Sequence, residues 1–144
     1  YIRCAGHLGW AFSASIGAQC GVPDRPVVCF TGDGGFLYHV AEIETAVRWN
    51  IPVVIVVNNN HSGNQSKLGY DQVYGGKQTE QAQELWVWTD VNIAKVAETF
   101  GAQGLRVEKP SEFAPALEKA IASRRTTIID VVTDMDAQAP LPIG

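Results

Sequence analysis

Two short polar clusters hold the residue types that could do chemistry in this chain. The first is Gly32-Asp33-Gly34-Gly35, which follows an apolar run and precedes a helical pattern. Glycines let a ligand approach the backbone closely, and the first turn of a helix offers free N–H groups to an anion such as phosphate. The Asp33 carboxylate would supply a hard oxygen for a cation beside that anion. The alternative is an ordinary strand-to-helix turn in which Asp33 caps the helix.

The second cluster is Asn58-Asn59-Asn60-His61, which follows the next apolar run. The interval between Asp33 and Asn59 fits one helix and one strand, so the two clusters would lie at neighbouring strand ends. Mg²⁺ prefers an octahedron of oxygen ligands, usually including substrate phosphates. Asp33, Asn59, a nearby backbone carbonyl and two phosphate oxygens would nearly complete that shell. As an alternative, runs of asparagine commonly form turns.

The elements that must position these clusters alternate between strand and helix. Apolar runs predict buried strands at 26–31, 53–57, 105–107 and 126–132. Composition and helical periodicity predict helices at 9–21, 36–49, 92–100 and 111–123. The run at 53–57 has no polar alternation, as in a parallel strand covered on both faces. The pattern predicts a doubly wound, mostly parallel α/β sheet with helices on both faces and a ligand at the carboxyl ends of its strands.

The composition predicts a folded domain and excludes several classes of partner. Of the 144 residues, 46% are hydrophobic and 18% are charged, which is not the balance of a disordered chain. A net charge of −4 argues against a nucleic-acid-binding surface. No apolar run has the length of a membrane span. The three cysteines show no C-x-x-C spacing, which favours reduced thiols in a cytoplasmic protein.

The stretch GDGGFLYHVAEIETAVRWNIPVVIVVNNN resembles the thiamine-diphosphate-binding motif, in which Gly-Asp-Gly is followed at this spacing by an Asn pair. The similarity extends upstream through AGHLGWAFSASIGA and downstream through VAETFGAQGLRVEKPSEFAPAL to TTIIDVVTD. Over nearly its whole length, the chain resembles the diphosphate-binding domain of acetolactate synthase and related 2-oxo-acid decarboxylases. The resemblance implies that this domain spans 1–133, without its first strand and helix. Pro140 and Pro142 predict an extended tail at 134–144.

The resemblance also implies a role for each residue of the metal site. Asp33 and the Asn59 side chain would bind Mg²⁺, with the backbone carbonyl of His61 as the third protein ligand. Asn58 and Asn59 could exchange roles in this alignment.

Contacts to the organic cofactor follow from the same resemblance. The carbonyl of Gly6 would accept from the pyrimidine amino group, and Leu8 would support the bent conformation of the cofactor. His7 would line the thiazolium pocket. The remaining cofactor-binding residues are glycines: Gly32, Gly34, Gly35 and Gly63. Of these, Gly34 and Gly35 would donate their backbone N–H groups to the diphosphate.

The activity implied is that of a thiamine-diphosphate enzyme, a transferase or lyase that decarboxylates 2-oxo acids and joins the product to a second carbonyl. In this family a glutamate on a separate pyrimidine-binding domain activates the cofactor, and no glutamate here matches it. We therefore expect this chain to be inactive alone and its parent to be a homo-oligomer in which a second subunit provides that domain. Whether the parent also binds FAD stays open.

Three other functions are alternatives to that of a carboligating thiamine-diphosphate enzyme. A simple 2-oxo-acid decarboxylase or a carboligase of other aldehydes is the nearest alternative, and a non-catalytic cofactor-binding fragment is another. A dinucleotide-binding domain is disfavoured because no G-x-G-x-x-G follows a strand. Structural roles are favoured for His39, and for Trp86 and Trp88 beneath the long loop at 58–90, whereas Gln65 falls where relatives place substrate-facing residues.

Overall fold

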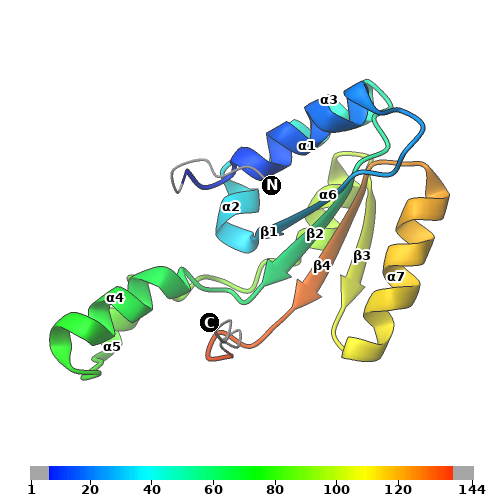
Figure 1. Cartoon of the computed structure of the whole chain (residues 1–144). Coiled ribbons are helices and arrows are strands. Elements are labelled where there is room, and N and C mark those ends of the chain that lie inside the picture. Colours follow the sequence, from blue (N-terminus) through cyan, green and yellow to red (C-terminus); the bar gives the residue numbers. More distant parts are fainter. Residues whose placement is uncertain (1–6, 138–144) are drawn as a thin grey trace, which may run out of the picture.

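A parallel sheet occupies the centre of the molecule (Figure 1). The structure, a computed structural model, describes residues 7–137. Its strands are β1 (Val28–Gly32), β2 (Val54–Asn59), β3 (Gln103–Val107) and β4 (Thr127–Val132). They lie in the order β1-β2-β4-β3, and every neighbouring pair is parallel. The predicted parallel α/β sheet is confirmed.

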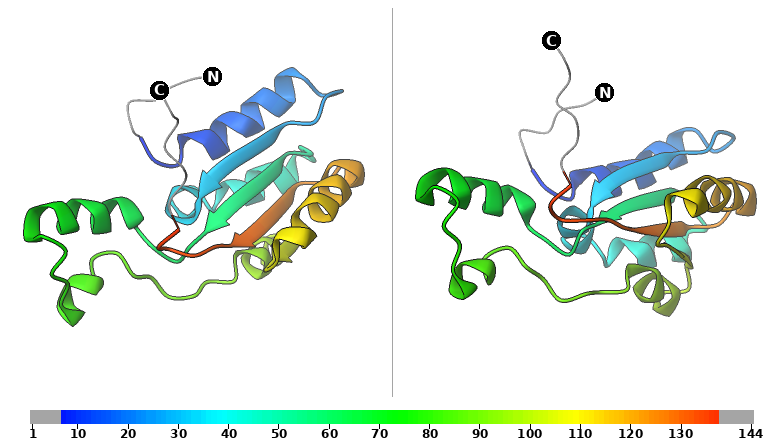
Figure 2. Two further views of the ribbon diagram at one scale, coloured as in Figure 1. Left: turned by 60° about the horizontal axis from the view of Figure 1, so that its bottom comes forward. Right: turned by 90° about the horizontal axis from the view of Figure 1, so that it is seen from below.

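Helices cover both faces of this sheet (Figure 2). In chain order they are α1 (Trp10–Gly21), α2 (Asp33–Leu37), α3 (Glu42–Arg48), α4 (Asn64–Tyr74), α5 (Glu80–Gln83), α6 (Ile93–Thr99) and α7 (Pro110–Ser123). Helices α3 and α6 pack with Ile55 and Val57 of β2 in one apolar cluster. Helix α7 packs with Val54 and Val56 in a second cluster on the opposite face. Because side chains of a strand alternate between faces, β2 serves both clusters, as predicted for this run.

Two helical regions differ from the sequence prediction. The helix predicted at 36–49 is divided, because α2 starts at Asp33 and ends at Leu37, and α3 begins only at Glu42. The stretch 58–90 contains α4 and α5, which project away from the sheet (Figure 1). No residue of α4 is buried. Without an apolar face turned to a core, this helix lacks the periodicity by which sequence analysis detects helices.

The predicted tail begins with a turn rather than an extended segment. The backbone N–H of Ala137 donates to the carbonyl of Asp134 at 3.3 Å. The side chain of Asn64, at the start of α4, donates to the carbonyl of Met135 at 2.7 Å. Residues 138–144 of the tail lie outside the described residues. No helix in the described part of the chain is long and apolar enough to cross a membrane.

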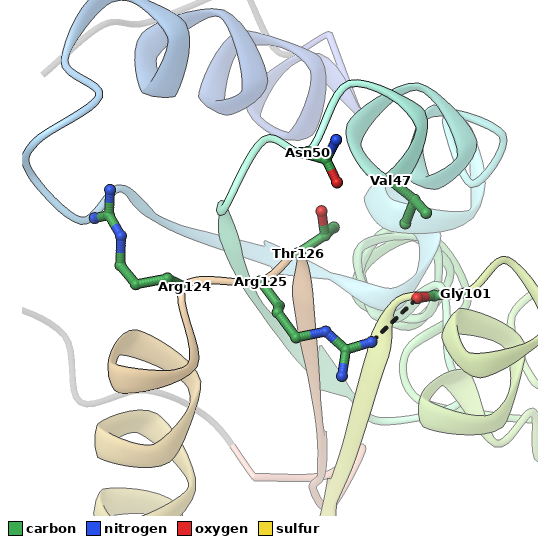
Figure 3. A pocket seen from close by; sticks show the side chains of 6 residues that line it. All are labelled: Val47, Asn50, Gly101, Arg124, Arg125 and Thr126. Carbon is green, nitrogen blue, oxygen red and sulfur yellow. Dashed lines mark hydrogen bonds between the residues drawn. The ribbon is translucent and has the colours of Figure 1, made fainter.

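The amino ends of the strands carry a shallow hollow, which Figure 3 shows from close by. Its lining includes Thr126 just before β4 and Asn50 just before β2. The Arg124 side chain donates to the carbonyl of Pro23 at 2.6 Å, and Arg125 lies 3.5 Å from the carbonyl of Gly101. Both arginines are exposed, and these contacts join the turn before β4 to the loops at Pro23 and Gly101. The candidate site lies at the other end of the strands.

Candidate functional site

The register of the sheet brings the two polar clusters together. Gly32 at the end of β1 is paired with Asn58 near the end of β2, so the turns that follow these strands are neighbours. Gly32 also caps α2 in an extended conformation, without any side-chain hydrogen bond to the helix start. Asp33 is the first residue of α2 and is only 5% exposed. The convergence that the spacing predicted for these two turns is thus present.

Asp33 is a buried carboxylate with one oxygen unsatisfied. Its Oδ1 accepts the backbone N–H of Gly34 at 2.8 Å, whereas its buried Oδ2 has no hydrogen-bond partner among the described residues. Burial raises the pKa of the Asp33 carboxyl, and the backbone N–H groups of Gly34, Ser62 and His61 act in the opposite direction. A buried oxygen without a partner is costly, so it suits a ligand that supplies positive charge.

The chemistry of the donor set fits a hard cation bound together with an anion. Within residues 7–137 no cluster of three or more His, Cys, Asp or Glu side chains could hold a metal. A cation at Asp33 would therefore need amide, carbonyl or phosphate oxygens to complete its shell, which is the coordination that Mg²⁺ takes beside phosphates.

The start of α1 packs directly against the Asp33 turn. A methyl group added at Gly35 would lie 2.8 Å from Oγ1 of Thr31 and 3.5 Å from the backbone nitrogen of Gly9. Gly9 has a φ of 88°, which favours glycine, and a methyl group there would overlap the ring of His39. This close packing places Leu8, which is 55% exposed, beside the glycine turn.

A cavity beside this contact is lined by His7, Leu8, Tyr38 and His39. The structure thus brings the predicted cofactor residues His7 and Leu8 beside Tyr38 and His39, which follow the short helix that Asp33 begins. The sequence did not predict Tyr38 or His39 as lining residues, because both fell within the helix predicted at 36–49, where a structural role was favoured for His39. The predicted contact of Gly6 lies outside the described residues.

The three consecutive asparagines have different partners. The Oδ1 of Asn58 accepts the hydroxyl of Thr133 at 2.7 Å. Asn59 is 1% exposed, and its amide nitrogen donates to Asp130 at 2.8 Å and to the Val91 carbonyl at 3.1 Å. Both partners accept, so the amino group of Asn59 must face them. Its amide joins β2 to β4 and to the segment before α6.

Asn60 lies in the turn that faces Asp33. Its Oδ1 accepts the backbone N–H of Ser62 at 3.1 Å. Asn60 is partly exposed, unlike Asn59. Asn60 was not among the predicted ligands, because spacing alone does not distinguish adjacent asparagines at a strand end.

His61 adopts a left-handed backbone conformation. Its φ is 55°, and its carbonyl oxygen accepts the backbone N–H of Trp88 at 2.8 Å. A carbonyl has two lone pairs, so this bond leaves room for a second partner. The imidazole Nε2 lies 3.4 Å from Asp90, which in turn lies 3.6 Å from Arg106.

Trp88 is an unpredicted member of the site. Its ring lies against both turns, because methyl groups added at Gly34 and Gly63 would come within 2.5 Å and 3.2 Å of it. Gly63 thereby joins the residues that the structure gathers around Asp33. A tryptophan in an aperiodic loop carries no sequence signal for such a position.

Comparisons with known proteins identify relatives of this chain. A family model described as "Thiamine pyrophosphate enzyme, C-terminal TPP binding domain" matches residues 2–131. The acetolactate synthase of Bacillus subtilis is 37% identical over 127 residues, which cover 88% of this chain and 21% of that protein. The acetolactate synthase large subunit of Haemophilus influenzae is 31% identical over 131 residues, covering 90% of this chain and 22% of that protein.

Further relatives carry other names within the same group. A 2-hydroxyacyl-CoA lyase of Arabidopsis thaliana is 34% identical over 137 residues, covering 93% of this chain and 23% of that protein. The solved thiamine diphosphate-dependent 4-hydroxybenzoylformate decarboxylase of Rhodococcus jostii superposes with a TM-score of 0.76 at 30% identity, over 91% of this chain and 24% of that one. The chain spans about a fifth to a quarter of the length of these proteins. It belongs to the thiamine pyrophosphate enzyme family, as a C-terminal TPP-binding domain.

Proposed function

We propose that this chain binds the diphosphate of thiamine diphosphate through Mg²⁺, as part of an acetolactate-synthase-like enzyme acting on 2-oxo acids. The observation that carries the proposal is the buried, unpartnered Oδ2 of Asp33 beside a glycine turn. The family supports thiamine diphosphate as the cofactor. The names of the relatives support decarboxylation with carboligation.

The metal would be held by Asp33 and the turn after β2. Oδ2 of Asp33 would be one ligand and the carbonyl of His61 another. For the amide oxygen, burial favours Asn60 over the Asn59 of the sequence prediction, since Asn59 is 1% exposed with its amide nitrogen held by Asp130, whereas Asn60 is partly exposed. The Oδ1 of Asn60 accepts the N–H of Ser62 and keeps a second lone pair for a metal. The diphosphate would then accept from the backbone N–H groups of Gly34 and Gly35, in agreement with the role of glycine turns in anion binding.

The remaining site residues would hold the organic part of the cofactor. Leu8 and His7 would flank the thiazolium, and the carbonyl of Gly6 would accept from the pyrimidine amino group. Gly32 and Gly63 would let the two turns approach the diphosphate. Bound thiamine diphosphate would supply the carbanion-stabilising chemistry that decarboxylation of a 2-oxo acid requires.

The parent enzyme would be a cytoplasmic homo-oligomer. The pyrimidine-binding domain of a second subunit would contribute the activating glutamate, and so the complete site would form between subunits. A simple 2-oxo-acid decarboxylase is the second candidate, favoured by the decarboxylase among the solved relatives.

Calorimetric titration of thiamine diphosphate into the chain, with and without Mg²⁺, tests the proposed site. We expect binding that requires Mg²⁺ and weakens at least about tenfold in Asp33→Asn and Asn60→Ala, in line with losses at metal sites. Asp24→Asn, at an exposed position, is the matched control and should bind normally. Unchanged metal-dependent binding in Asp33→Asn would exclude the assignment. A loss confined to Asn59→Ala, with the fold intact by circular dichroism, would return the amide ligand to Asn59.

The activity of the chain alone gives a second test. With pyruvate, Mg²⁺ and thiamine diphosphate, we expect neither acetolactate nor acetaldehyde above the rate without protein. Turnover by the 144-residue chain would contradict the proposal that another domain supplies the activating glutamate.

A further inference from the structure

The indole of Trp88 lies between the two turns of the candidate site. A methyl group added at Gly34 would come within 2.5 Å of Cη2 and 3.1 Å of Cζ3 of Trp88. One added at Gly63 would come within 3.2 Å of Cζ2. These three atoms belong to the six-membered ring, so this end of the indole touches the turn after β1 and the turn after β2 together.

Backbone hydrogen bonds hold the segment that carries this ring against the turn after β2. The N–H of Trp88 donates to the carbonyl of His61 at 2.8 Å, and the N–H of Gly63 donates to the carbonyl of Trp86 at 2.8 Å. Ser62 and Val87 form an antiparallel bridge between these bonds. Trp86, two residues before Trp88, is 1% exposed, so the chain on that side of Trp88 is buried. These bonds hold the backbone of Trp88 beside the turn after β2.

The position of the ring also shapes the surroundings of the turns. Trp88 is 37% exposed, so one part of the ring covers the glycines while another faces solvent. Together with Gly34, Leu37 and Tyr38 it lines a hollow on the outer side of the Asp33 turn. An apolar ring here keeps water from one side of the turns, and electrostatic attraction is stronger where water is excluded.

We propose that Trp88 is a positioning residue, which sets the spacing between the Gly34 turn and the Gly63 turn so that a metal diphosphate can bridge them. This inference rests on the proposed function of the site. A bulky rigid group held between two turns limits how closely they approach, and binding sites lose affinity when such supporting contacts are loosened. Because Gly34 and Gly63 have no side chains, there is space between the two turns for the indole of Trp88.

Thermal unfolding without cofactor tests the contact itself. The variants are Gly34→Ala, Trp88→Leu and the double variant, where Leu keeps apolar bulk but does not reach Gly34. We expect Gly34→Ala to lower the unfolding midpoint in the wild-type background and to lower it much less when Trp88 is already Leu. Additive effects of the two substitutions would show that the ring does not press on Gly34, and would overturn the proposal.

Affinity for Mg²⁺–thiamine diphosphate then tests the role. We expect Trp88→Leu to weaken binding about tenfold and Trp88→Phe to retain most of it, because a ring of similar thickness still separates the turns. Trp49→Phe, at a site 65% exposed and away from both turns, is the control and should bind as the wild type does. Tighter binding in Trp88→Leu would mean that the ring obstructs the site and would overturn the role.

The two measurements separate this inference from the proposed function. If the wild type binds no thiamine diphosphate with Mg²⁺, the proposed function fails, and coupling between Gly34 and Trp88 in thermal unfolding would show that the contact exists without that role. If the wild type binds and Trp88→Leu binds equally well, the positioning role alone is wrong.

Discussion

At the scale of single residues, Gln19 shows how one buried side chain can order a loop. Gln19 lies in α1 and is 1% exposed. Its amide nitrogen donates to the carbonyls of Val22 and Arg25 at 3.1 Å and 2.9 Å, and its oxygen accepts the N–H of Val27 at 3.0 Å. All three partners belong to the connection from α1 to β1. The side chain thereby replaces the hydrogen bonds that these backbone groups would otherwise make with water.

Replacing Gln19 by Ala should destabilise the domain markedly. The substitution leaves backbone groups of the connection without partners, and we expect a loss of about 2–3 kcal/mol in the free energy of unfolding. Urea denaturation measures it. Gln72→Ala, at an exposed position of α4, is the matched control and should stay within about 0.5 kcal/mol of the wild type. Equal midpoints for the two variants would mean that water satisfies the same backbone groups.

The three asparagines show why the site could be located from sequence but not resolved to the residue. The type and spacing of Asp33 and the Asn run predict that two strand ends meet, and the register of β1 and β2 agrees with this. Side chains alternate along a strand, so Asn58 and Asn59 reach different partners, and Asn60 lies beyond the strand. Which asparagine faces Asp33 depends on where β2 ends, and identical side chains carry no signal for that.

At the scale of elements, Asp130 joins four parts of the fold. It lies in β4 and is 0% exposed. Its carboxylate accepts from Asn59 of β2 at 2.8 Å, from the N–H of Ile93 at the start of α6 at 3.0 Å, and from Arg106 of β3 at 2.8 Å. Arg106 continues the network to Asp90, which lies near His61 of the candidate site. One buried carboxylate therefore sets the mutual positions of three strands and a helix.

Asp130→Asn should lower the free energy of unfolding far more than Glu108→Gln, although both carboxylates pair with Arg106. Removing the charge leaves Arg106, whose side chain is 20% exposed, without its buried partner, and we expect a loss of about 3 kcal/mol. Glu108→Gln is the matched control, because Glu108 also pairs with Arg106 but is 65% exposed, so its loss should stay below about 1 kcal/mol. Chemical denaturation compares them, and similar losses would contradict the structural role of Asp130.

The contact between α6 and β3 depends on a glycine. A methyl group added at Gly104 would lie 2.7 Å from the carbonyl carbon of Ala94 and overlap its oxygen. Gly104→Ala should therefore separate the helix from the strand and cost about 3 kcal/mol, at the upper end of overpacking effects. Gly17→Ala is the control, since nothing lies within 4 Å of its added methyl group, and it should stabilise α1 by about 0.5–1 kcal/mol. Thermal unfolding distinguishes the two, and a neutral Gly104→Ala would show that α6 can shift freely.

Most of the strands and helices that bury an apolar face were predicted from the sequence. The run at 53–57 became the fully buried β2, with Val54 to Val57 at most 4% exposed. The prediction missed the division between α2 and α3, and it allowed short helices in the 58–90 stretch without bounds for them. In α4 no residue is buried, so packing imposes no pattern on its sequence. Trp88 was missed for a related reason, since its position depends on backbone bonds to the next turn rather than on periodicity.

At the scale of the whole molecule, the structure divides into a packed sheet and a projecting arm. The apolar clusters lie on the two faces of the sheet, around β2 and β4. The arm, formed by α4 and α5, extends from the carboxyl edge of the sheet (Figure 2). Aromatic contacts of Tyr70 with Tyr74 and with Trp86 lie along α4 and join it to the segment after α5. Local stability follows buried apolar contact, so the two parts should open with different free energies.

Hydrogen exchange should resolve these two parts. Amides of β2 are paired in the sheet and covered on both faces, so they should exchange only when the whole domain unfolds. Amides of α4 should exchange much faster, because local opening of the arm exposes them without disturbing the sheet. Addition of Mg²⁺ and thiamine diphosphate should protect the turn at 61–63 while leaving α4 unchanged, and Asp33→Asn should abolish that protection. Exchange of α4 as slow as that of β2 would show that the arm packs on the body of the molecule, and protection of α4 by the cofactor would show that the site extends onto it.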